Sequence, residues 1–493
     1  MERSSGVLLH ISSLPGEGGI GCLGKDAYQF VDFLVQTKQK VWQILPLGPV
    51  GFGNSPYQCY SAFAGNPLFI DLEQLVADRF LPKTAIASPG FKDKTVEFER
   101  VEQWKLAILR EAFAGFCNNF ERFRDEYHSF MQQHSWWLDD YAHFRSLKTK
   151  LNGTVWNCWD KKLVTRDFDT LKSSFAELHE ETDFHRFMQF IFFRQWYKLK
   201  SYANSKGVKI IGDIPLYVSF DSVDVWANQD IFLLDDDAKP TQVGGVPPDY
   251  FSETGQLWGN PVFNWERLAQ RNFDWWLARI HFNLKMFDRV RVDHFRGLES
   301  FWAIPADAET AVAGEWLPAK GYELLARLKE QLGTLEIIAE DLGIITPEVE
   351  KLRDDFQLPG MKVLQFAFGS DVTNMNLPHN YASNFLVYTG THDNDTSLGW
   401  FNSTGKKARK FLHRYIAGSG KQFVCNFMEY AWASAAYTAM APMQDVLALG
   451  SESRMNTPGV AAGNWGWRFT WSQIRPNHRR FLKQITEKYN RKD

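Results

Sequence analysis

The stretch FDRVRVDHFRG, residues 287–297, alternates as a β-strand does, yet it carries charges where a buried strand would not be expected to have them. Successive side chains of a strand face opposite sides, so the two valines would point one way and Arg289, Arg291 and Asp293 the other. The neighbouring segments suggest that neither face of this strand meets bulk water. Arg291 and Asp293 would then lie side by side at the inner end of a buried strand, which indicates a polar site.

Seven further β-rich runs flank this one, and most are separated by helical patterns. The eight runs are residues 6–11, 40–47, 208–218, 288–294, 335–343, 361–368, 384–393 and 437–449. Two of the helical stretches are residues 182–207, which begin with capping candidates and end at a glycine, and residues 321–333. Eight strands that alternate with helices predict an α/β fold, a parallel (β/α)8 TIM barrel.

Two segments are longer than a minimal barrel needs. Residues 75–180 are rich in helical patterns, and residues 220–285 begin as a loop rich in glycine, proline and aromatic residues. Both follow strand ends, where barrel enzymes carry their insertions. Because no repeat, low-complexity tract or flexible linker stands out, we expect residues 1–493 to form a single catalytic domain with inserted helical and loop subdomains.

The composition excludes several classes of partner. A formal net charge of −3 and a pI of about 6.5 give no basic field for nucleic acid or a membrane surface. The five cysteines are odd in number, scattered and without metal-ligand spacing, so we expect reduced thiols in a reducing compartment. No signal peptide or membrane-spanning run is predicted, which favours a soluble cytoplasmic protein, or a plastid stromal one if the source is a plant or alga.

Four of the predicted strands finish on an acid, namely Asp213, Asp293, Glu340 and Asp393. In a parallel barrel these carboxyl ends share one rim, the rim that carries the active site in barrel enzymes. Carboxylates alone can bind Mg²⁺ or Ca²⁺. Arg291 on the same strand face would repel such an ion, however, and would instead keep Asp293 ionised. We therefore expect proton chemistry at this rim and no metal.

An ionised carboxylate and a carboxylic acid at one rim suit glycoside chemistry. Asp293 would attack the anomeric carbon, and Glu340 on the neighbouring strand would protonate the leaving oxygen. The two groups would lie about 5–5.5 Å apart, the spacing of retaining enzymes. Asp341 is the alternative acid, but strand alternation points it away from the face of Glu340. Asp393 and His392 would bind sugar hydroxyls.

The same segments resemble a known family. VRVDHFRG, IIAEDLG and THDND, preceded by IIGDIP, are similar to the four signature segments of the α-amylase clan. SSGVLLHISSLPG, GNSPYQCYSAFAGNP, GGVPPDYFSETGQLWGNP, RMNTPGV and GNWGWR resemble the 4-α-glucanotransferases called amylomaltases or disproportionating enzymes, glycoside hydrolase family 77. The resemblance covers residues 5 to 470. It implies a (β/α)8 barrel, no metal or organic cofactor, and transfer of α-1,4-glucan segments to a maltooligosaccharide or glucose acceptor.

The resemblance also assigns roles to individual residues. Asp293 corresponds to the nucleophile, Glu340 to the general acid/base and Asp393 to the third carboxylate. The residues that match the surrounding shell are Arg291, His294, His392 and Asp213. The residues that match sugar contacts are Tyr57, Asp249, Gln256, Trp258 and Asn464. Two positions depart from the family pattern: Cys59 stands where a small hydroxyl residue is expected, and Gly466 where a longer side chain is common.

Several alternatives remain open on the sequence. Asp293 could form only a structural ion pair with Arg291, Asp393 could cap the turn that follows it, and Asp213 could merely orient Arg291. An α-amylase-type hydrolase would carry the same acids, and a glucan-binding protein without activity is a rival of another class. Transfer requires that water be kept from the intermediate, and the long aromatic loops 50–67 and 245–261 are the predicted walls of such a cleft.

Overall fold

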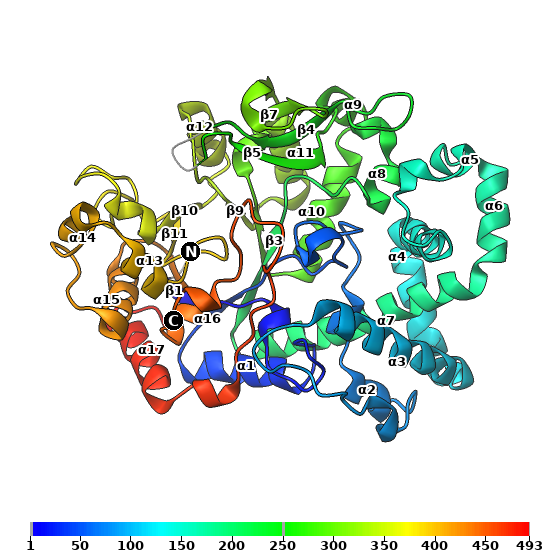
Figure 1. Ribbon diagram of the computed structural model, residues 1–493, viewed down its shortest axis with the longest axis horizontal. Coiled ribbons are helices and arrows are strands. Elements are labelled where there is room, and N and C mark those ends of the chain that lie inside the picture. The colour runs from blue at the N-terminus through cyan, green and yellow to red at the C-terminus, as the bar shows by residue number, and fades with distance from the viewer. Residues whose placement is uncertain (1–2, 249–251, 493) are drawn as a thin grey trace.

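The computed structural model describes residues 3–248 and 252–492 (Figure 1). Eight parallel strands form one sheet in the order β10-β11-β12-β1-β2-β3-β6-β9. They are β1 (Ser4–Leu8), β2 (Val41–Gln43), β3 (Lys209–Ile214), β6 (Arg289–Val292), β9 (Ile337–Ala339), β10 (Gly360–Val363), β11 (Phe385–Tyr388) and β12 (Thr438–Pro442). The backbone N–H of Ala339 donates to the carbonyl of Pro359 (2.9 Å), next to the start of β10. The sheet is thus a nearly closed barrel, and the predicted fold class is confirmed.

Helices cover the outside of the barrel, and α1 (Lys25–Gln36) shows how an apolar face packs one of them there. In α1 the buried residues Ala27, Phe30, Val31 and Leu34 recur at three- and four-residue intervals, the spacing of one helical face. The other helices beside the barrel strands are α7 (His179–Ser205), α10 (Asp274–Met286), α11 (Gly321–Leu332), α12 (Pro347–Asp355), α13 (Ser397–Ser403), α14 (Lys406–Leu412), α15 (Gly420–Ala433), α16 (Met443–Val446) and α17 (Pro476–Lys488). None of the helices in the described ranges is long and apolar enough to cross a membrane.

The connection from β2 to β3 contains a helical subdomain, at the right of Figure 1. Its helices are α2 (Leu72–Ala77), α3 (Phe98–Asn118), α4 (Phe120–Lys150), α5 (Lys161–Val164) and α6 (Phe168–Glu177), followed by α7. Aromatic rings join it to the barrel: Phe193 of α7 lies 5.8 Å from Trp137 of α4 and 5.7 Å from Phe282 of α10, between ring centroids. The helical insertion therefore shares the hydrophobic core of the barrel.

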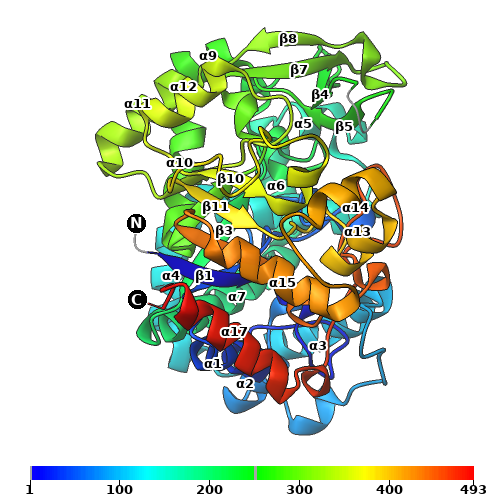
Figure 2. The ribbon, with the colours of Figure 1, turned by 90° about the vertical axis from the view of Figure 1, so that its left-hand side faces the viewer.

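A second, antiparallel sheet stands beyond the barrel rim; Figure 2 shows β7 and β8 at the end of the molecule above β10 and β11. Its order is β5-β4-β7-β8. The strands are β4 (Gln242–Val246), β5 (Gln256–Pro261), β7 (Ser300–Pro305) and β8 (Glu315–Pro318), and the short helices α8 (Val223–Ala227) and α9 (Trp265–Gln270) flank β4 and β5 in the chain. The stretch around β4 and β5 was expected to be a loop because of its glycines. Gly245 is needed there because a Cβ would lie 2.2 Å from the carbonyl oxygen of Gln256 on β5.

The barrel strands end several residues before the β-rich runs that were predicted from the sequence. Asp213 still lies inside β3, whereas Asp293 and Glu340 directly follow β6 and β9, and Asp393 lies in the loop after β11. The carboxyl ends of parallel strands meet at one rim, so the strand ends and the first loop residues carry all four acids to the same end of the barrel. All five cysteines are unpaired.

Candidate active site

Arg291 occupies the centre of the site and binds two acids at once. Its Nη1 donates to both carboxylate oxygens of Asp213 (2.8 and 2.7 Å), and its Nη2 donates to Oδ1 of Asp293 (2.7 Å). Asp213 and Arg291 face each other across the β3–β6 step, and each is only 3% exposed. Burial alone would lower the pKa of Arg291, but the charges of Asp213 and Asp293 outweigh it and raise that pKa. The guanidinium is therefore a fixed positive charge beside Asp293.

Glu340 is held against the same strand end. Its backbone N–H donates to the carbonyl of Val292 (3.1 Å), and its carbonyl accepts from the N–H of Phe295 (3.1 Å), so its main chain pairs on both sides of Asp293. Its Oε2 accepts from the backbone N–H of His294 (2.7 Å). Burial, together with the negative charge of Asp293, raises the pKa of Glu340 well above its ordinary value. The site thus favours the protonated form of Glu340 beside Asp293.

Asp341 points away from this pair, as strand alternation predicts. It forms an ion pair with Nη1 of Arg353, and its Oδ1 accepts from the backbone N–H of Met361 (2.7 Å). The carboxylate of Asp341 is therefore bound between β9 and β10. Within the described ranges, no group of three or more His, Cys, Asp and Glu side chains is arranged to hold a metal ion.

Tyr57 and His392 connect Asp213 with Asp393. The Tyr57 hydroxyl donates to Oδ2 of Asp213 (2.7 Å) and lies 2.9 Å from Nε2 of His392, and the two rings stack with centroids 5.2 Å apart. His392 Nε2 lies 3.3 Å from Oδ2 of Asp393. Although burial raises the pKa of Asp393, the charge of His392 and hydrogen bonds from His392 and Asn456 lower it below its ordinary value. Asp393 is thus kept ionised, in the opposite sense to Glu340.

Trp258 and His294 form an aromatic pair next to Asp293. Trp258 on β5 meets the ring of His294 edge-on, with centroids 4.9 Å apart, and its Nε1 donates to Oε1 of Gln256 (3.2 Å). His294 has left-handed backbone angles (φ 53°, ψ 48°), and its Nε2 is buried without a hydrogen-bond partner in the described structure. Burial lowers the pKa of His294 to about 4, so the ring is neutral. The small sheet thus brings Gln256 and Trp258 to the barrel rim.

One predicted sugar contact, Asn464, has no hydrogen bond to these acids within the described residues. Asn464 fixes its own loop, because its Oδ1 accepts from the N–H of Thr457 (3.0 Å) and its Nδ2 donates to the carbonyl of Val460 (2.8 Å). Asp249 lies outside the described residues. Conversely, sequence reasoning missed Asn456, whose Nδ2 donates to Oδ1 of Asp393 (2.6 Å). The only signal for Asn456 was its place in RMNTPGV, which follows no strand end.

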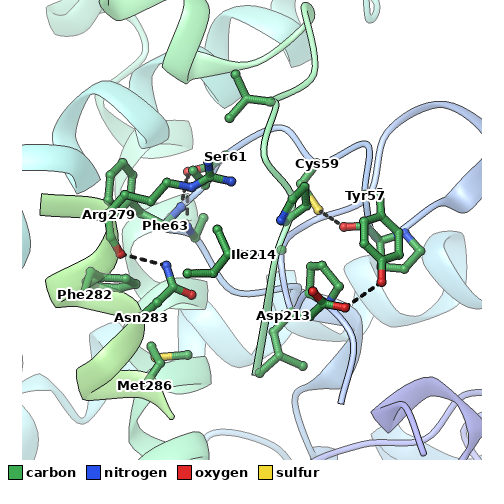
Figure 3. A pocket seen from close by; sticks show the side chains of 18 of the residues that line it. Tyr57, Cys59, Ser61, Phe63, Asp213, Ile214, Arg279, Phe282, Asn283 and Met286 are labelled. Carbon is green, nitrogen blue, oxygen red and sulfur yellow. Dashed lines mark hydrogen bonds between the residues drawn. The ribbon is translucent and has the colours of Figure 1, made fainter. Parts of the chain in front are cut away.

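A small cavity of about 60 Å³ lies behind Asp213 (Figure 3). Tyr57 and Asp213 border it at one end, and Arg279 and Asn283 of α10 at the other (Figure 3). A single water needs about 10–15 Å³ of such space, so this cavity has room for water molecules. Cys59, one of the two departures from the family pattern, also lines it. Its thiol donates to the carbonyl of Pro56 (3.0 Å), and burial raises its pKa to about 12, which favours the neutral thiol.

Comparison with known proteins places this geometry in a family. The family model described as 4-alpha-glucanotransferase, glycoside hydrolase 77, matches residues 9–473. A 4-alpha-glucanotransferase of Synechocystis sp. is 48% identical over 100% of this chain and 98% of its own. One of Thermus thermophilus is 46% identical over 99% of both chains. Among solved structures, the amylomaltase of Streptococcus agalactiae in complex with acarbose superposes with a TM-score of 0.97 at 41% identity, over 100% of both chains.

Proposed function

Because the chain belongs to the 4-alpha-glucanotransferase family, glycoside hydrolase 77, we propose that it moves α-1,4-glucan segments by a retaining double displacement through a glycosyl-aspartate. The enzyme class follows from the family. The observation that supports the mechanism is that Asp293 and Glu340 follow the paired strands β6 and β9, the first beside a guanidinium and the second with a raised pKa.

In the first step, Asp293 forms a bond to C1 of the donor glucan while the C1–O4 bond breaks. Arg291 holds Oδ1 of Asp293, so Oδ2 is the oxygen that attacks. Glu340 gives its proton to the departing O4, and the shortened glucan leaves with a free 4-hydroxyl. A carboxylic acid whose pKa is raised by burial is suited to this task near neutral pH.

In the second step, the 4-hydroxyl of an acceptor sugar attacks C1 and the Asp293–C1 ester bond breaks. Glu340, now a carboxylate, takes the acceptor's proton, so both groups return to their starting states. The glycosyl-aspartate keeps the free energy of the glycosidic bond, and no nucleotide is needed. The donor is an α-1,4-glucan, and the acceptor is a maltooligosaccharide or glucose.

The remaining predicted residues bind and distort the sugar. Asp393, ionised and paired with His392, would hydrogen-bond the hydroxyls of the reacting sugar ring. Trp258 would offer an aromatic surface to the sugar, and Tyr57, which stacks on His392, would line the site through its hydroxyl. Gln256, Asn464 and Asp249 are sugar contacts on the strength of the resemblance, and His294 and Asp213 support Trp258 and the guanidinium.

Transfer is favoured over hydrolysis when water is excluded from the glycosyl-aspartate. Segment 50–67 supplies Tyr57, and segment 245–261 supplies Trp258 on β5, so both predicted walls carry an aromatic residue at the site. The relatives named above are transferases by name, which supports the same choice. A cytoplasmic or plastid location stays a prediction.

Incubation of the purified protein with maltotriose tests the function. A transferase releases glucose and builds maltooligosaccharides longer than maltotriose, which chromatography separates. A hydrolase produces glucose and maltose without elongation, and a glucan-binding protein leaves maltotriose unchanged. Either of these two results contradicts the proposed activity.

A further inference from the structure

The segment Arg454–Asn456 runs along the peptide that carries His392 and Asp393. The backbone N–H of Asn456 donates to the carbonyl of His392 (3.1 Å), and its side-chain Nδ2 donates to Oδ1 of Asp393 (2.6 Å). Arg454 Nη2 donates to the backbone carbonyl of Asp393 (2.6 Å), and Arg454 Nε donates to the carbonyl of Asn456 (2.7 Å). Two residues far away in the chain therefore fix both the main chain and the carboxylate of Asp393.

This segment is itself anchored in the protein. Met455, between the two contacting residues, is 5% exposed and packs with Leu45 and Trp465 in a buried cluster. Its carbonyl accepts from the N–H of Trp465 (2.7 Å), and its sulfur accepts from the hydroxyl of Ser13 (3.8 Å). A donor on such a support is held in place before substrate binds, which is the condition for a precisely oriented catalytic group.

We propose that Asn456 is a positioning residue that sets the orientation of the Asp393 carboxylate. Asp393 lies in a loop and its side chain is 42% exposed, so without partners it would sample several rotamers. Asn456 donates to Oδ1 of Asp393, and His392 lies next to Oδ2. Because each oxygen has its own partner, the plane of the carboxylate is fixed. Hydrogen bonds to a charged acceptor are typically short and strong, and this one is 2.6 Å long. The inference rests on the role proposed for Asp393.

A double-mutant cycle tests whether Asn456 acts through Asp393. We expect Asn456→Ala to lower kcat for maltotriose transfer on the order of 10- to 100-fold, since misplacement of a catalytic group by about 1 Å costs that much. In an Asp393→Ala background, measured at high enzyme concentration, the same change should alter kcat less than about 2-fold, because contacting residues are non-additive. Asn402→Ala, on the exposed surface of α13, is the matched control and should leave kcat unchanged.

A second variant separates the loss of this hydrogen bond from a folding defect. Asn456→Asp keeps the shape and the backbone contacts but replaces the donor with an acceptor, so it should stay folded and lose at least as much kcat as Asn456→Ala. The positioning role is overturned if Asn456→Ala loses the same factor of kcat in both backgrounds, or if Asn456→Asp keeps wild-type kcat. Neither result contradicts the proposed function. A wild-type protein without transfer, or a fully active Asp393→Ala, overturns the proposed function and this inference with it.

Discussion

A single guanidinium explains why two charged residues lie at the end of a buried strand. Arg291 satisfies Asp213 on one side and Asp293 on the other, and Tyr57 gives Asp213 one more donor. Buried charges are tolerated only when they are paired and hydrogen-bonded in this way. Burial and the charge of Asp293 raise the pKa of Glu340, whereas the charge of His392 and hydrogen bonds from His392 and Asn456 outweigh burial and lower the pKa of Asp393. The raised pKa suits Glu340 to the role of proton donor, and the lowered pKa keeps Asp393 an acceptor for sugar hydroxyls.

Replacement of Glu340 by glutamine should separate activity from stability. Turnover of maltotriose should fall on the order of 10³-fold, within the range that general acid–base groups contribute. Burial raises the folded-state pKa of Glu340, so its contribution to stability is complete at low pH and is lost as pH rises through that pKa. Glutamine cannot ionise, so Glu340→Gln does not lose stability in this way as pH rises.

Thermal unfolding followed from pH 5 to pH 9 measures this effect. The Tm of Glu340→Gln should match that of the wild type at the acidic end and exceed it increasingly toward the alkaline end. A Tm difference that shrinks or reverses as pH rises would contradict the burial of a protonated Glu340. The inactive variant must also bind maltooligosaccharides, which shows that the site is intact.

Local sequence patterns predicted the acids at and just after the strand ends, but they did not predict Asn456. Period-two alternation separates Glu340 from Asp341, and the structure places Asp341 in an ion pair with Arg353, away from the site. Asn456 could not be found in this way, because its contact with Asp393 joins two loops through tertiary packing and no local pattern encodes it. Asn464 was assigned from its motif, and its side chain hydrogen-bonds within its own loop; its contact with sugar stays a prediction.

At the scale of elements, the small antiparallel sheet extends the barrel rim. Gly244 and Gly245 lower the strand propensity of β4, yet both are required by close neighbours: a Cβ at Gly244 would lie 2.4 Å from the ring of Tyr217. These two glycines made the segment look like a loop in the sequence, and they also allow β4 to pack closely against Tyr217 and β5. The eight barrel strands were predicted because each is a short run of buried β-formers between helices, a pattern that local sequence carries.

The alternation of side chains along β5 predicts which of them contacts the substrate. Trp258→Ala should lower kcat/KM on long glucans by about 1–3 kcal/mol of transition-state binding, by analogy with the stacking of bases on aromatic rings. Leu257 points to the opposite face and is 41% exposed, so Leu257→Ala is the matched control and should retain wild-type kinetics. Steady-state rates on amylose for both variants check this. Equal kinetics of Trp258→Ala and wild type would remove the tryptophan from the substrate site.

At the scale of the whole molecule, one core runs from the barrel into the helical insertion. Phe63, in the segment after β2, lies 5.5 Å from Phe282 of α10 and 6.4 Å from Trp137 of α4, between ring centroids. We propose that the barrel and the insertions near residues 75–180 and 220–285 form one catalytic domain. Burial of apolar surface against a shared core couples the stability of such parts.

Calorimetry of the full chain checks this domain organisation. A shared core predicts a single endotherm, and Trp137→Ala should lower its midpoint as a whole, since loss of a buried tryptophan costs about 3–5 kcal/mol. Trp136→Ala, at an exposed position on the same helix, is the control and should cost much less. Two resolved endotherms, of which only one responds to Trp137→Ala, would show instead that the insertion folds by itself.

The central claim is that Asp293 forms the covalent bond while Glu340 supplies the proton, and mass spectrometry of a trapped intermediate tests it most directly. α-Maltotriosyl fluoride needs no acid to release its leaving group, so Glu340→Gln should react with it and then stall before the acceptor is activated. The account predicts a mass gain of one maltotriosyl group on the peptide that contains Asp293, and no gain in Asp293→Ala/Glu340→Gln. Consumption of the fluoride without any mass gain, or a label on another residue such as Asp393, would contradict it.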